Sequence, residues 1–233
     1  MMKSRTLFAV LAVALPLSSP AFSDDVIGEV EMVNVWAYGT PPDSGRRDLR
    51  ANQDVHAQEL IETVKTGEIL IEFEDGTTLG MGSESAIVLG ELVYDRSVRD
   101  SMVLTMSEGF FHFVTGDIAP EAVTIVTPAM IIGIRGTDIA VGVDPSTTEL
   151  GVRSGTATAT STAGGATVDV GAGQTASASV DRDGVSVSSG LSSAAAGAMP
   201  GQGGGAGGSS AGGGGRGGDG GGGGSDGGGG GYQ

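Results

Sequence analysis

The sequence predicts an all-β protein: a domain of many short strands in a β-solenoid-like or β-sandwich-like arrangement, followed by a disordered C-terminal tail. Three observations support this prediction. Apolar and polar residues alternate with a period of two, glycine-containing turns separate the alternating runs, and glycine accumulates towards the carboxyl end. A period of two places alternate side chains on opposite faces of a strand, so that each run can bury one face. Many short strands with regular turns are typical of sandwiches, barrels and solenoids.

One run shows the alternation most clearly. Ile69, Ile71 and Phe73 are predicted to point into a core, while the intervening glutamates point to solvent. The pair Asp75-Gly76 then closes the run with a turn suited to positive φ. The same pattern predicts strands near residues 102–106, 123–125, 139–143, 156–160 and 176–180.

The stretch Asp54–Lys65 is the part of the domain that most resembles a helix. However, Val55, Ala57, Glu59 and Ile61 also alternate with other residues along this stretch. We therefore predict strand here as well.

The amino terminus has the features of a targeting signal. Lys3 and Arg5 precede the apolar run Leu7–Leu17, and the small residues of Ala21-Phe22-Ser23 suit cleavage by signal peptidase. Residues 1–23 are therefore predicted to be a signal peptide. No later apolar run approaches the length of about 20 residues that a membrane-spanning helix needs. The sequence thus predicts a periplasmic or secreted, cell-surface protein with no membrane span after signal cleavage.

The rest of the chain divides into two parts by composition. Residues 24–189 carry the alternating runs and are predicted to form the all-β domain. Residues 190–233 contain 24 of the 44 glycines and are predicted to be a glycine-rich disordered tail. Such a segment cannot bury enough apolar area to offset the entropy of its backbone.

Charge and residue types exclude several classes of function. The net charge of −16 disfavours binding to nucleic acid, which requires clustered cations. The chain has no cysteine, and its two histidines, His56 and His112, lie outside any zinc-binding pattern. The stretch Gly82–Ala86 lacks the final glycine of a nucleophile elbow. The sequence therefore predicts no enzyme activity, no metal site and no cofactor, and it predicts that His112 is a bonded or half-exposed strand residue.

Several motifs resemble those of the FecR-domain family. Residues 63–95, TVKTGEILIEFEDGTTLGMGSESAIVLGELVYD, resemble the first family signature, and residues 127–140, TPAMIIGIRGTDIA, resemble the second. The segments GVRSG at 151–155 and VGAGQ at 170–174 are similar to the closing strands. The resemblance extends from Ile27 to Val187. It implies a small β-solenoid-like module outside the inner membrane, which in the best-known members sits on a transmembrane anti-sigma regulator.

Two turns are the candidate partner-binding or structural motifs: Asp75, Gly76 and Thr77 in the first signature, and Arg135, Gly136 and Thr137 in the second. Asp75 and Thr77 are suited to bonding nearby backbone around a turn at Gly76. Arg135 follows an apolar run and is expected to bind carbonyl groups or a carboxylate, with an anionic ligand or partner as the alternative.

Three functional hypotheses follow from these features. The first is a non-catalytic module that binds or scaffolds an envelope protein or a cell-wall glycan, with β-strand addition along an exposed sheet edge as its mechanism. The second is a periplasmic sensor or regulator related to siderophore-receptor signalling, and the third is a structural cell-surface protein. A homo-oligomer is possible because an uncapped solenoid can stack on another copy.

Overall fold

The computed structural model describes residues 25–93, 101–119 and 121–192, which all belong to one compact unit. Within these ranges the chain forms fifteen strands and no helix, which confirms the all-β prediction. No helix long and apolar enough to cross a membrane occurs in the described part. The predicted signal peptide and nearly all of the predicted tail lie outside the described residues.

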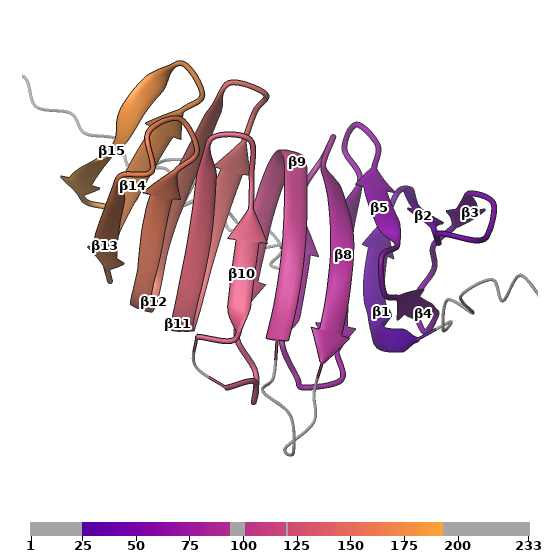
Figure 1. Cartoon of the computed structure of the whole chain (residues 1–233). Coiled ribbons are helices and arrows are strands. Elements are labelled where there is room, and N and C mark those ends of the chain that lie inside the picture. Colours follow the sequence, from indigo (N-terminus) through magenta and orange to yellow (C-terminus); the bar gives the residue numbers. More distant parts are fainter. Residues whose placement is uncertain (1–24, 94–100, 120, 193–233) are drawn as a thin grey trace, which may run out of the picture. The chain divides into compact units, whose positions relative to one another are not determined.

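The strands run from Val26 to Ser189, as Figure 1 shows. Their bounds are β1 Val26–Asn34, β2 Ala37–Thr40, β3 Arg47–Asp48, β4 Asp54–His56, β5 Leu60–Thr63, β6 Glu68–Phe73, β7 Thr78–Met81, β8 Ala86–Val93, β9 Ser101–Val114, β10 Val123–Val126, β11 Met130–Val143, β12 Thr147–Ser161, β13 Thr167–Gly171, β14 Gln174–Ser179 and β15 Arg182–Ser189.

The strand pairings form two layers that share one core. The first layer has the order β3-β2-β5-β8-β9-β10-β11-β12-β13, with the amino-terminal parts of β9 and β11 and the carboxyl-terminal part of β12. The second layer has the order β4-β1-β6-β7-β9-β11-β12-β14-β15 and contains the other parts of the three long strands. Every pair is antiparallel except β9 with β10. Inward side chains of both layers belong to a single hydrophobic cluster.

The three long strands β9, β11 and β12 each pass from one layer to the other. Their lengths of 14, 14 and 15 residues differ from the short strands that the sequence predicts. Each bend contains a glycine with positive φ: Gly109 at 110°, Gly136 at 54° and Gly155 at 79°. Because glycine adopts this conformation without a steric penalty, the backbone turns the corner and resumes strand pairing on the other side.

The core contains the residues that the alternation predicts. Ile69, Ile71 and Phe73 are at most 2% exposed. The segment Asp54–Lys65 forms β4 and β5, in agreement with the prediction of strand. Val180, the last residue of the strand predicted near residues 176–180, lies outside it, because β14 ends at Ser179 and the valine is 37% exposed in the following turn.

The amino-terminal end of the core is closed by residues 41–53. Leu49 in this segment is 3% exposed and donates its backbone N–H to the carbonyl of Ala37. Glu59 is fully buried beneath the segment, and both of its carboxylate oxygens accept hydrogen bonds from the Arg47 guanidinium at 2.9 and 3.0 Å. The backbone N–H of His56 donates a further bond to Glu59 at 2.9 Å. This end of the domain is therefore capped by an apolar plug and a bonded ion pair.

Candidate functional site

The first motif turn is a buried structural corner between β6 and β7. Asp75 and Thr77 are 4% and 0% exposed. The Asp75 carboxylate accepts bonds from the Thr77 backbone N–H at 3.1 Å and from the Thr77 hydroxyl at 2.6 Å. Gly76 lies between them with a φ of 76°, the turn geometry that the sequence predicts.

A segment between β9 and β10 binds to this first corner. The backbone N–H of Gly116 donates to the Thr77 hydroxyl at 3.0 Å, and that of Asp117 donates to the Asp75 carbonyl at 2.7 Å. A Cβ atom on Gly116 would lie 2.3 Å from the Asp75 carbonyl oxygen. Only glycine therefore allows the two backbones to approach this closely.

The second motif turn joins the same segment from the other side. The backbone N–H of Thr115 donates to the Thr137 carbonyl at 3.0 Å, and that of Thr137 donates to the Thr115 hydroxyl at 2.5 Å. Residues 115–117 thus connect the two motif turns, which are 60 residues apart in the chain when counted from Asp75 to Arg135. The hydrogen bonds give both motifs a role in holding successive corners together.

Arg135 is the motif side chain that reaches solvent. It is 59% exposed, and its guanidinium lies 2.6 Å from the carboxylate of Glu121. Together with Gly133, these residues border a small groove of about 210 Å³ on the outer face of the first layer. Arg135 thus binds a carboxylate, one of the two partner groups expected for it, although that carboxylate belongs to the same chain. An exposed ion pair of this kind contributes little to stability.

His112 lies on β9 and is 4% exposed. Its Nε2 atom is 2.7 Å from a carboxylate oxygen of Asp138 on β11. The residue is therefore bonded, one of the two states predicted for it. Within the described residues, no group of three or more histidine, cysteine, aspartate or glutamate side chains could hold a metal ion.

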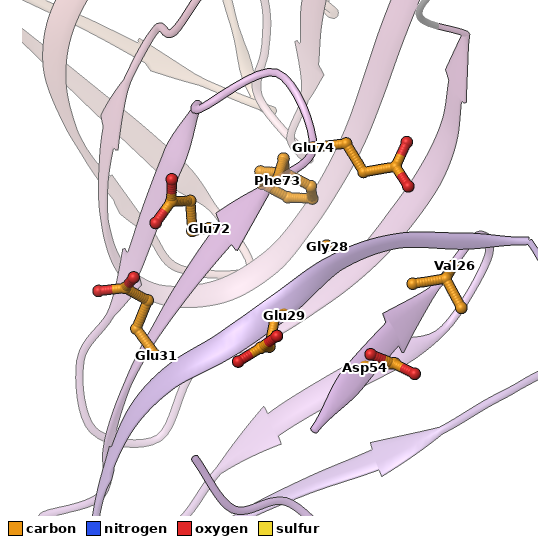
Figure 2. Close-up of a pocket in the computed structure, with 8 residues that line it drawn as sticks. All are labelled: Val26, Gly28, Glu29, Glu31, Asp54, Glu72, Phe73 and Glu74. Atoms are coloured by element: carbon orange, nitrogen blue, oxygen red, sulfur yellow. The ribbon is translucent and has the colours of Figure 1, made fainter. Parts of the chain in front are cut away.

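A larger hollow of about 420 Å³ lies on β1, β4 and β6 and has an acidic lining, as Figure 2 shows. A Cβ atom on Gly28, in its floor, would lie 2.5 Å from the carbonyl oxygen of Glu72. The lining residues are Val26, Gly28, Glu29, Glu31, Asp54, Glu72, Phe73 and Glu74. Carboxylates in such a hollow can accept hydrogen bonds and attract cationic groups.

Two of these carboxyl groups, Glu31 and Glu72, interact directly. A hydrogen bond to Glu72 and repulsion from its charge raise the pKa of Glu31 above its ordinary value of 4.5. The alternation predicts that the glutamates beside Ile69, Ile71 and Phe73 face solvent, but it does not predict the hollow. Glu29 and Glu31 are a signal of the hollow, because residues two positions apart along a strand lie on the same face.

We expect Glu31→Gln to stabilise the protein at neutral pH, because it removes the repulsion from Glu72. A carboxyl group whose folded-state pKa is raised contributes stability below its unfolded pKa, and this contribution is lost as the pH rises through the folded pKa. The advantage of the variant should therefore be present at pH 7 and disappear below pH ~4. Thermal unfolding across this pH range measures the effect, and Glu108→Gln, outside the hollow, is the control. Equal stability of Glu31→Gln and wild type at pH 7 would contradict the expectation.

The carboxyl-terminal end of the domain contrasts with the capped amino-terminal end. In the described part of the chain, the edge strands at the amino-terminal end, β3 and β4, have only two and three residues, whereas β13 and β15 have five and eight. Among the described residues β15 pairs only with β14, and β13 pairs only with β12. Long edge strands expose a row of backbone donors and acceptors that another strand can satisfy.

Apolar side chains also gather at this end. In the described residues, three of the eight exposed large hydrophobic side chains lie between residues 180 and 191: Val180 at 37%, Val187 at 41% and Leu191 at 37%. Val168 on β13 and Val185 on β15 are only partly buried against the core. This end therefore combines unpaired strand edges with exposed apolar area, which is the combination that strand addition requires.

Comparison with known proteins identifies the class of the domain. Residues 59–158 match the family described as FecR protein, and this part of the chain is a FecR domain, as the motifs predicted. Two crystal structures of a putative anti-sigma factor from Parabacteroides distasonis ATCC 8503, at 2.50 and 1.65 Å resolution, are similar to the chain. Each has 11% sequence identity and a TM-score of 0.46, and the match covers 56% of this chain and 59% of that chain. No curated protein sequence matches.

Proposed function

We propose that this protein is a non-catalytic, exported interaction module that takes up an extended strand of a partner chain along β15. The open edge of β15 is the observation that carries the proposal. Residues 184–189 contain no charged residue and no proline, the two devices that most often block addition of a strand to an edge. A strand added here would extend the second layer and cover Val187.

The rest of the domain is consistent with a scaffold for this edge. Hydrogen bonds within the domain hold the motif turns, and Arg135 is already paired with Glu121. The long strands β11 and β12 lead directly to β14 and β15 through continuous pairing. A continuous sheet therefore presents the edge, and the predicted amino-terminal signal supports export to the periplasm or the cell surface.

Val187→Lys should abolish strand addition, because a lysine on an edge strand opposes pairing with another chain. Val103→Lys is a matched control, since Val103 is 42% exposed on the outer face of the first layer, away from β15. A photo-reactive residue placed at Ser186 of the full chain should form a crosslink to a partner in intact cells. We expect Val187→Lys to lower the yield of this crosslink at least about tenfold, and Val103→Lys to leave it unchanged.

Circular dichroism of the purified variants would establish that both retain the β-sheet fold. A crosslink that forms equally in Val187→Lys and in wild type would overturn strand addition at β15. A partner that crosslinks only through a photo-reactive residue at Thr105, on the outer face of the first layer, would move the interaction to that face.

A further inference from the structure

The charges on β15 are arranged so that the strand is complementary to itself. Its two charged residues, Arg182 and Asp183, come first, and the remaining six are uncharged. A twofold axis between two antiparallel strands keeps the same side chains on the same face in both copies, so that odd-numbered residues lie opposite odd-numbered ones. In such a pair with Ser186 opposite Ser186 of a second copy, Arg182 lies opposite the second copy's Gly190. Asp183 then lies opposite Ser189 of the second copy, so that no like charges face each other across the pair.

The exposed apolar side chains fit the same arrangement. Val187 is 41% exposed, and the twofold pair places it opposite Val185 of the second copy, a valine on the same face that is only partly buried against the core. Leu191 lies beyond the end of the strand, where the start of the second copy's β15 and the exposed Val180 before it would be its neighbours. Pairing two copies would therefore cover apolar area as well as unpaired backbone.

We propose that β15 pairs with β15 of a second copy of the chain, so that two domains form one continuous second layer about a twofold axis. This inference rests on the proposed function, because it names the chain whose strand β15 takes up. An isologous contact uses the same patch on both copies and closes on itself, so that the product is a dimer. The edge strands at the amino-terminal end, β3 and β4, have only two and three residues, so that they are too short to pair along the whole of an eight-residue strand.

The affinity of the two copies for each other should rise when salt is added. Each copy carries a net charge of −16, so that two copies repel each other, and residues 184–189 themselves carry no charge. Raising the ionic strength from about 0.01 M to about 0.15 M shortens the screening length from about 30 Å to about 8 Å. Added salt should therefore strengthen the dimer, whereas it would weaken an association held by opposite charges.

Sedimentation equilibrium of the purified full chain tests the proposal without any other partner. We expect a dimer for wild type and for Val103→Lys, and a dissociation constant raised at least about tenfold in Val187→Lys. A wild-type protein that stays monomeric at both ionic strengths would overturn the second-copy proposal. If Val187→Lys still loses its crosslink in cells, that monomer would leave strand addition to a different partner intact.

Single-cysteine variants test the twofold axis. The natural chain has no cysteine, so each introduced thiol reports on one position. In antiparallel self-pairing only residues near the axis meet their own copies, and under mild oxidation the yield of disulfide-linked dimer should peak at Ser186→Cys. Thr105→Cys is the control and should remain monomeric. A uniform yield along residues 184–189, or a yield at Thr105 equal to that at residue 186, would contradict the twofold pairing.

Discussion

Replacing Arg47 by alanine is expected to lower the free energy of unfolding by about 3–5 kcal/mol, one of the two largest effects that we expect of any single substitution. Glu59 is fully buried, and its Oε1 and Oε2 atoms accept bonds from the Arg47 guanidinium at 2.9 and 3.0 Å. The alanine variant leaves a carboxylate charge in the core without its cationic partner. It also removes the bond from Arg47 to the carbonyl of Asp54, which ties the capping segment to β4.

The neighbouring residue provides a matched control for this prediction. Arg46 also pairs with a glutamate, Glu62, at 3.4 Å, but both side chains are exposed. Arg46→Ala should therefore cost less than about 1 kcal/mol. Urea denaturation followed by circular dichroism measures both variants. Equal losses for Arg46→Ala and Arg47→Ala would show that the burial of Glu59 does not govern the stability of the cap.

The alternation along Asp54–Lys65 predicted strand, and the structure forms β4 and β5 there. The alternation places Glu59 on the same side as Val55 and Ile61, and all three are fully buried in the structure. The sequence does not reveal the partner, because Arg47 lies twelve residues earlier in a segment with no periodic pattern. The local pattern thus predicted the strands, whereas the burial of Glu59 and its contact with Arg47 depend on tertiary folding.

The roles of the motif turns were predicted in part. The sequence predicts a turn at Gly76 and a bonded arginine at position 135, and the structure shows both. It does not predict that Thr115–Asp117 connects the two turns, because those hydrogen bonds join residues 22 to 42 positions apart. The sequence does not predict the open edge of β15 either, since period-two alternation distinguishes the faces of a strand but not its edges.

The largest effect of a backbone change is expected at the corner of β12. Gly155 has a φ of 79°, and a Cβ atom there would lie 2.1 Å from the carbonyl oxygen of Gly136 in the adjacent corner of β11. Gly155→Ala therefore combines a left-handed backbone penalty with a collision against a neighbouring backbone. We expect the free energy of unfolding to fall by about 2–4 kcal/mol, measured by urea denaturation.

Gly136→Ala separates the two causes, because Gly136 also has positive φ, at 54°, but a Cβ atom there would contact nothing within 4 Å. Its cost should be about 1–2 kcal/mol, the conformational penalty alone. The difference between the variants then measures how closely the two corners stack, which is what allows β11 and β12 to cross between layers together. If the two alanine variants lose the same stability, the corners have room to separate. The support that β11 and β12 give to β14 and β15 would then come from the packing of the core rather than from the stacked glycines.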